Sequence, residues 1–173
     1  MLVVAATQRE LEGAPGESLV CGVGPVEAAA RVAAALAASR PDAVLHVGLA
    51  GSRTLAPLTV VLGSAAVYED ISAAIPVIDR AEPDATLLER LRAALPEALV
   101  LPIGTSAAVG GSGACEVEAM EGFGVLRACA LAGVPAVELR VIANSPDEPD
   151  RAKWRLEEAL GVLRATLDRL DVL

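Results

Sequence analysis

Short apolar runs alternate along this chain with longer stretches in which apolar residues recur every three or four positions. The short runs are rich in β-branched residues and are typical of buried strands, whereas the Ala- and Leu-rich stretches are typical of helices. This alternation predicts an α/β fold in which helices cover both faces of a sheet. Predicted strands cover residues 2–6, 18–22, 43–48, 98–103 and 136–143, and residues 58–67 fit either one long strand or two.

Four helices are predicted, over residues 25–39, 84–95 and 116–131 and at the C-terminal end. The third has clear end signals, because Gly133 follows its last apolar position and Pro135 lies just beyond. A stretch rich in Gly, Ser and Ala, residues 105–114, predicts a mobile loop. In the final helix, leucines recur at alternating steps of four and three and are expected to close the core: Leu156, Leu160, Leu163, Leu167 and Leu170.

Length and composition favour a single domain over residues 1–173, since 54% of the residues are hydrophobic. The net charge of −9 argues against nucleic acid or an anionic membrane as the partner and favours a small ligand. No apolar run is long enough to span a bilayer, and Glu10 and Glu12 fall where a signal peptide would be apolar, so a cytoplasmic location is expected. The three cysteines form no CxxC pair, and no metal, redox group or other cofactor is implied.

Polar or glycine-rich segments follow three of the predicted strands: residues 7–10, residues 48–51 and Asn144. Open α/β sheets bind their ligands at the carboxyl ends of strands, so these segments are expected to converge on one pocket. Leu49, Ala50 and Gly51 could present main-chain amides to a base or sugar, because glycine lets a ligand approach the backbone. A turn after a strand needs glycine in any case, so this signal is weak alone.

Glu121 follows Met120 within an apolar stretch of the predicted third helix. One interpretation is a buried carboxylate that accepts hydrogen bonds from two vicinal ribose hydroxyls, because buried carboxylates are rarely left unpaired. The other, equally weighted, is a solvent-facing carboxylate paired with Arg127 or another surface base.

Four other features invite a functional interpretation and have a plainer one. His46 is the only histidine, and within an apolar strand it is better explained as a core residue. The turn over residues 22–25 resembles a phosphate-binding loop but lacks the complete motif. Residues 68–70 could hold a metal, yet two carboxylates at a strand end are usually solvated. Trp154, with Arg151, could cover the pocket or anchor the core.

Several segments together resemble the nucleoside phosphorylase and nucleosidase superfamily. They are VVAATQREL, CGVGPVEAA, HVGLAGS and, most specifically, VEAMEGFGVLRACALAGVPAVELRVIAN followed by DRAKW. Within the superfamily the sequence is most similar to futalosine hydrolases, through VEAMEG and the strand that runs from Arg140 to Asn144. The resemblance implies a three-layer α/β/α phosphorylase/hydrolase-like fold with a central mixed sheet.

The resemblance also implies cleavage of an N-glycosidic bond through an oxocarbenium-like transition state. Glu10 would activate the attacking water, Glu121 would hold the ribose hydroxyls and Met120 would pack under the sugar. Asn144 stands where related nucleosidases have an aspartic acid that protonates the purine, and its amide suits the edge of a 6-oxopurine such as hypoxanthine. Arg140 would support the pocket, or else bind a neighbouring subunit or a carboxylate.

On this resemblance the substrate is expected to be futalosine or a similar nucleoside, which would give the protein a role in menaquinone biosynthesis, and a homo-oligomer is expected. A purine nucleoside phosphorylase stays open, with Arg9, Arg53 and the turn over residues 22–24 as the candidate phosphate ligands. A non-catalytic nucleoside-binding protein stays open too, since the second glutamate of the methylthioadenosine branch is here Ala119.

Overall fold

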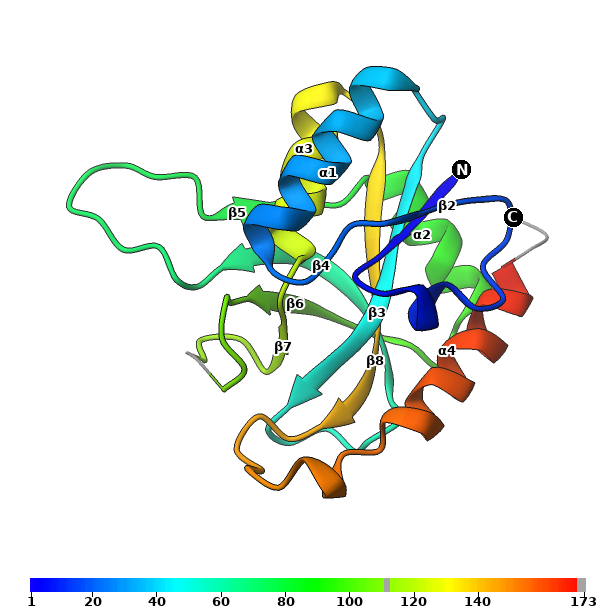
Figure 1. Cartoon of the computed structure of the whole chain (residues 1–173), viewed down its shortest axis with the longest axis vertical. Helices are drawn as coiled ribbons and strands as arrows, with labels where there is room; N and C mark the ends of the chain where they lie inside the picture. Colours follow the sequence, from blue (N-terminus) through cyan, green and yellow to red (C-terminus); the bar gives the residue numbers. More distant parts are fainter. Residues whose placement is uncertain (111–112, 171–173) are drawn as a thin grey trace.

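A computed structural model describes residues 1–110 and 113–170 of the chain. These residues form eight strands, four α-helices and two short 3-10 helices (Figure 1), in the predicted alternating order except for the additional short strands β5 and β7. The elements are β1 (Leu2–Ala5), η1 (Gln8–Leu11), β2 (Glu17–Val20), α1 (Pro25–Ala38), β3 (Val44–Ser52), β4 (Val60–Tyr68), β5 (Arg80–Ala81), α2 (Ala85–Ala94), β6 (Leu99–Thr105), β7 (Val117–Ala119), α3 (Gly122–Ala132), β8 (Ala136–Asn144), η2 (Arg151–Lys153) and α4 (Leu156–Leu170).

The strands form one mixed sheet in the order β2-β1-β3-β7-β6-β4-β5, and β8 pairs with both β3 and β4. Parallel pairs join β1 to β3 and β3 to β8, so the carboxyl ends of these three strands point the same way. The pairings also close a ring, because β3, β8, β4, β6 and β7 each pair with the next and β7 returns to β3. Side chains from all five strands fill its interior.

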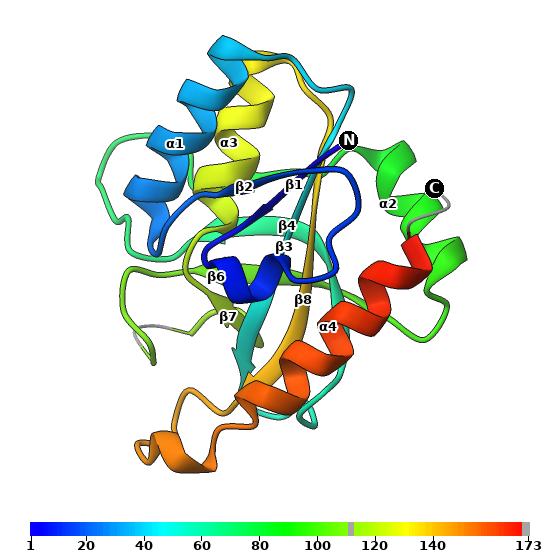
Figure 2. The ribbon, with the colours of Figure 1, turned by 45° about the vertical axis from the view of Figure 1, so that its right-hand side comes forward.

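Helices cover both faces of the sheet, as the alternating pattern predicted, and the three-layer fold with a mixed sheet is confirmed. On one face α2 and α4 pack on apolar residues of β1, β3, β4 and β8. On the other face α1 and α3 lie side by side, in contact with each other and with the sheet (Figure 2). Leu163, Leu167 and Leu170 of α4 are buried in the layer formed by α2 and α4, so the final helix helps to close the core on that face.

The third helix is shorter than the sequence predicted. It begins at Gly122 instead of about residue 116, and residues 117–119 form strand β7. The reason is that Val117 and Ala119 point into the interior of the ring while Glu118 pairs with Gly51 of β3. The apolar residues of this stretch fit either a helix or a strand, and its pairing with a distant strand decides in favour of the strand.

Three further predictions have a clear outcome. Residues 60–68 are one strand rather than two, and β3 extends to Ser52, so the GLAG segment lies inside a strand and is not a turn after it. The helix predicted over residues 84–95 is confirmed, with the Asp84 side chain accepting a hydrogen bond from the amide of Leu87 at its start. Part of the loop predicted as mobile, residues 111 and 112, lies outside the described residues.

A long connection between β4 and β5 projects from the body of the molecule (Figure 1). Ile75 and Ile78 on this connection are 70% and 56% exposed. Within residues 1–110 and 113–170, no helix has the length and apolar character needed to cross a membrane.

Candidate active site

A cavity of about 320 Å³ opens at the carboxyl ends of β1, β3 and β8. This volume lies within the range of small-molecule sites, and the position is the one where open α/β sheets bind ligands. The structure brings together seven of the eight residues that the sequence proposed for the site. These are Glu10, Leu49, Ala50, Gly51, Met120, Glu121 and Asn144.

The Glu10 carboxylate is held at the cavity wall by three donors. Its Oε2 accepts from the amide and the hydroxyl of Thr7, at 3.0 and 2.8 Å, and its Oε1 accepts from the amide of Leu49 at 3.0 Å. Thr7 and Glu10 have the spacing of a capping box, and they cap the short helix η1. A carboxylate has about four acceptor positions, so three donors fix its orientation and leave one position open.

Glu121 is buried, with 4% of its surface exposed, and it stands immediately before α3. Its Oε1 accepts from the amide of Gly24 at 3.1 Å, and its Oε2 lies 3.4 Å from the guanidinium of Arg140. Gly24 has a φ of 94°, a conformation that favours glycine. The buried interpretation of Glu121 is therefore confirmed, and the alternative of a surface pair with Arg127 is wrong. Its expected contact with ribose stays a prediction.

Arg140 does not line the cavity. It is 1% exposed and lies behind the wall, where its Nε donates to Glu138 Oε1 at 2.8 Å and its Nη1 to the carbonyl of Leu49 at 3.4 Å. The guanidinium also contacts Nε2 of His46 and Oε2 of Glu121. Of the roles that the sequence left open, the structure shows binding of carboxylates, and because one of them, Glu121, lines the cavity, Arg140 supports the pocket from behind its wall. Removing one member of such a buried ion pair costs about 3–5 kcal/mol.

His46 and Glu138 complete this buried group and both are fully enclosed. Burial lowers the pKa of His46 well below its usual value, which favours a neutral imidazole whose Nδ1 faces the carbonyl of Val4. Burial also raises the pKa of Glu138, whose Oε2 has no hydrogen-bond partner among the described residues. The interpretation of His46 as a core residue is confirmed.

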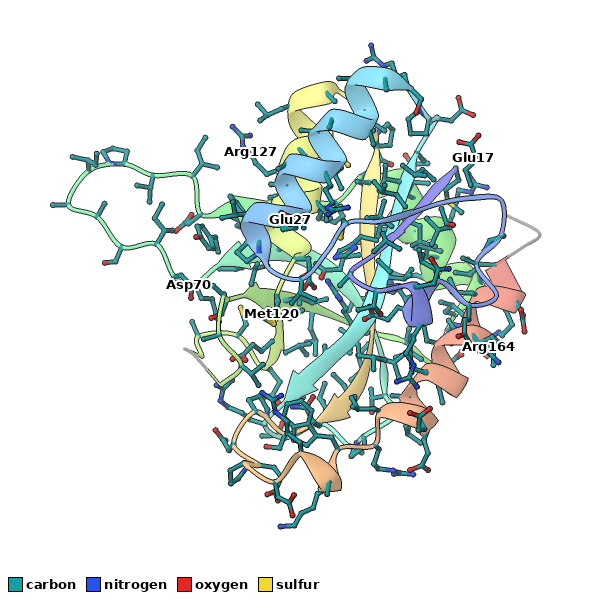
Figure 3. The ribbon with its side chains drawn as sticks, in the orientation of Figure 1. Glu17, Glu27, Asp70, Met120, Arg127 and Arg164 are labelled. Atoms are coloured by element: carbon teal, nitrogen blue, oxygen red, sulfur yellow. The ribbon has the colours of Figure 1, made fainter. Side chains whose placement is uncertain are left out.

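The β3 segment and Asn144 also line the cavity. Asn144 ends β8, pairs in register with Gly51, and makes no hydrogen bond with its side chain within the described part of the chain. A Cβ on Gly51 would lie 2.9 Å from Cγ of Pro146 and 3.2 Å from Asn144 Nδ2, so glycine allows both side chains to pack closely on this strand. Met120 lies between the α1–α3 pair and the strand ends (Figure 3).

The remaining candidates have mixed outcomes. Trp154 lines the cavity, its Nε1 donates to the carbonyl of Glu148, and the Arg151 guanidinium lies 5.4 Å from its ring centroid. Glu69 and Asp70 do not form a metal site with a third ligand among the described residues. They accept instead from backbone amides of Cys115 and Ala107, which fixes the loops that follow β6.

The sequence analysis placed Thr7 at the pocket within residues 7–10 but not its contact with Glu10, which the Thr-x-x-Glu spacing of a capping box could have indicated. It missed Glu118, which also lines the cavity. Glu118 was missed because the helix was predicted to begin at about residue 116, whereas its position beside Gly51 follows only from the pairing of β7 with β3.

Comparisons of this chain with a family model and with curated proteins agree on one family. The phosphorylase superfamily matches residues 10–171. Futalosine hydrolase of Streptomyces coelicolor is 51% identical over 53 residues, which are 31% of this chain and 23% of that protein. Futalosine hydrolase of Thermus thermophilus is 43% identical over 54 residues, 31% of this chain and 24% of that protein. The matched segments thus span about a quarter of these curated relatives.

Solved structures share the fold at low sequence identity. A futalosine hydrolase mutant of Helicobacter pylori superposes with a TM-score of 0.88 at 18% identity, covering 99% of this chain and 98% of that one. An S-adenosylhomocysteine nucleosidase of Streptococcus pyogenes superposes with a TM-score of 0.85 at 18% identity, covering 99% and 96%. With the family match over almost its whole length, this chain belongs to the phosphorylase superfamily.

Proposed function

We propose that this chain hydrolyses the N-glycosidic bond of a 6-oxopurine nucleoside, with futalosine as the first candidate and hypoxanthine as the released base. The observation that carries the proposal is the arrangement of two carboxylates, Glu10 and Glu121, at one cavity of the size of a small-molecule site. The partial matches to futalosine hydrolases from two organisms support the same substrate class.

Glu10 is suited to bind and activate water. Its three protein donors leave one acceptor position, and a water bound there can donate a proton to the carboxylate as its oxygen attacks the anomeric carbon. The C–N bond to the purine breaks, its electron pair leaves with the base, and the purine takes up a proton. Asn144 would donate a hydrogen bond to the departing base, which disperses its growing negative charge.

Glu121 is suited to accept from ribose hydroxyls while offsetting positive charge on the sugar. Its two oxygens are already oriented by Gly24 and Arg140, so little reorganisation is needed on binding. Met120 would provide the apolar surface beside the sugar.

Phosphorolysis is less well supported by the candidate phosphate ligands. The amide of Gly24 already donates to Glu121, and Arg9 makes two bonds of 2.6 and 2.7 Å with Glu157. Arg53 lies 3.7 Å from Glu118. The Arg9 and Arg53 side chains and the amide of Gly24 are thus each already paired with a carboxylate of the chain.

A homo-oligomer and a cytoplasmic location remain part of the proposal. The oligomer is supported by a groove of about 500 Å³ between α1 and α3, lined almost entirely by apolar residues such as Val26, Phe123 and Leu131.

The test is release of free base from futalosine, inosine and methylthioadenosine, each with and without phosphate, followed by chromatography. Hypoxanthine released without phosphate is the expected result. If base release strictly required phosphate, the chain would be a phosphorylase. If no base were released from any of the three nucleosides, a non-catalytic binding protein would be favoured.

A further inference from the structure

Glu138 is a buried carboxylate that the proposed mechanism does not use. It lies on β8 and is fully enclosed, and a Cβ on Gly122, the first residue of α3, would collide with both of its oxygens. Gly63 on β4 leaves room in the same way, since a Cβ there would lie 3.2 Å from Glu138 Cβ. Two glycine positions thus accommodate this carboxylate, although a buried charge is costly unless it is paired.

Arg140 supplies the partner charge for Glu138. Its Nε donates to Glu138 Oε1 at 2.8 Å, whereas its Nη2 lies 3.4 Å from Glu121 Oε2. Burial raises the pKa of Glu138, and the positive charge of Arg140 opposes that rise. The carboxylate also lies against the first residue of α3, where the helix dipole favours a negative charge. Both effects favour the ionised form of Glu138, which binds Arg140 more closely than Glu121 does.

One guanidinium is consequently shared by two carboxylates in different surroundings. Glu121 lines the cavity, whereas Glu138 lies behind the cavity wall. A charge-assisted hydrogen bond is strong at about 2.7–2.9 Å, so the longer contact of Arg140 with Glu121 offsets less of the negative charge of Glu121. That charge is therefore available to the cavity, where the sugar becomes positive in the proposed reaction.

We propose that Glu138 is a positioning residue that holds Arg140 away from Glu121 and so keeps the Glu121 carboxylate negative toward the sugar. This inference rests on the proposed function. Without the charge of Glu138, Arg140 would move onto Glu121 and neutralise it. The effect is specific to the transition state, because the ribose is neutral in the bound nucleoside and becomes cationic only as the C–N bond breaks.

The first experiment is the kinetics of Glu138→Gln, which removes the charge and keeps the size of the side chain. We expect kcat for base release to fall about 10- to 100-fold while KM changes less than about threefold. Glu17→Gln, an exposed change on β2, is the control and should leave both constants unchanged. An unchanged kcat in Glu138→Gln, or a loss confined to KM, would overturn the role of Glu138 and leave the proposed hydrolysis intact. A wild-type chain that releases no base from any nucleoside would overturn both.

The second experiment measures the charge that the cavity offers to the sugar. Calorimetric titration compares two analogues of inosine, one with a protonated pyrrolidine in place of the ribose ring and one with a neutral cyclopentane. The wild-type chain should bind the cationic analogue at least about 100-fold more tightly, and Glu138→Gln should reduce this ratio at least about tenfold. A purely structural disturbance would weaken both analogues alike, so an unchanged ratio would overturn the proposal.

Glu138→Asp keeps the buried charge and serves as the test if Glu138→Gln does not fold. Its carboxylate is one methylene shorter, so its bond to Arg140 must lengthen, and the ratio of the two affinities should fall about threefold. In a Glu121→Gln background, changes at Glu138 should leave the ratio unaltered, because their effect acts through Glu121. A wild-type ratio in Glu138→Asp, or an effect that persists without the charge of Glu121, would show that Glu138 has only a packing role.

Discussion

Glu10 illustrates how one side chain can be held for a chemical task by its neighbours. The amide and hydroxyl of Thr7 and the amide of Leu49 all donate to it, so the protein fixes both oxygens before any substrate arrives. Glu10→Gln keeps the size of the side chain but replaces one acceptor oxygen by a donor, and the amide is not a base.

We therefore expect Glu10→Gln to reduce base release at least about 100-fold, the usual contribution of a general base. The measurement is the initial rate of base release at saturating nucleoside, with hypoxanthine binding as a check that the cavity persists. Turnover that survives this change would disprove the mechanism proposed for Glu10.

Gly48 controls the position of the same carboxylate. A Cβ added there would lie 2.7 Å from Glu10 Oε1 and would also collide with the guanidinium of Arg140. Both groups are enclosed, so Gly48→Ala must displace at least one of them. Since a misplacement of about 1 Å can cost on the order of 100-fold in rate, turnover should fall by this order while substrate binding changes less.

The matched control for this change is Gly161→Ala in α4, where the added Cβ would meet nothing within 4 Å. That variant should retain wild-type turnover and gain up to about 1 kcal/mol of stability, because alanine favours the helix. Unchanged turnover in Gly48→Ala would mean that Glu10 does not need its observed position.

The sequence was sufficient to identify some carboxylates of the site but not all of them. Glu10 and Glu121 could be identified because each lies in a segment that resembles a family motif, and these segments occur in the family's order along the chain. Glu118 could not be identified, because its place at the cavity depends on β7 pairing with β3, a contact between residues more than 60 positions apart. Arg140 was found, yet its enclosure by Glu138 and His46 depends on the pairing of β3 with β8.

At the scale of elements, the predictions succeeded where burial has a regular period. Helices α1 and α2 begin and end close to their predicted positions, and α4 spans the five leucines that predicted it, since each helix presents one apolar stripe to the sheet. The helix predicted over residues 116–121 was wrong, because the apolar residues of this stretch fit a helix or a short strand equally well. They form a strand because Val117 and Ala119 pack in the interior of the ring of strands.

Glu116, at the edge of that stretch, connects it to the loop after β3. Its Oε1 accepts from the Ser52 hydroxyl at 2.6 Å and from the Thr54 amide at 2.7 Å. The hydrogen bond from Ser52, followed by that from Thr54, lowers the pKa of Glu116 from 4.5 to about 2. Because the folded-state pKa lies below the unfolded value, this carboxylate stabilises the fold above pH 4.5 and loses that effect as the pH falls towards 2.

Glu116→Gln should therefore lower the unfolding midpoint at pH 7, and the difference from wild type should shrink between about pH 4.5 and 2. Urea unfolding over this range measures it, with the exposed change Glu89→Gln on α2 as control. A difference that stays constant with pH would show that the charge of Glu116 is not what fixes the loop.

At the scale of the whole molecule, the layers leave one apolar face uncovered. The outer side of α1 and α3 carries Val26 and Leu131, which are 78% and 73% exposed, and Arg127 projects from the same helix pair (Figure 3). In the opposite layer, Leu91 of α2 and Leu163, Leu167 and Leu170 of α4 are buried. Exposed apolar surface of this kind marks interaction sites, and the occupant proposed here is a second copy of the chain.

The wild-type chain should accordingly sediment as a dimer or larger assembly at micromolar concentration. Burial of a Val or Leu side chain contributes about 1.5–3 kcal/mol, and a buried lysine would add a desolvation cost, so Val26→Lys should weaken association at least about tenfold. Leu99→Lys, at the start of β6, introduces the same charge elsewhere and should leave the assembly unchanged. Sedimentation velocity over a range of concentrations distinguishes these outcomes, and a wild-type chain that remains monomeric at the highest concentration would rule out self-association through the α1–α3 face.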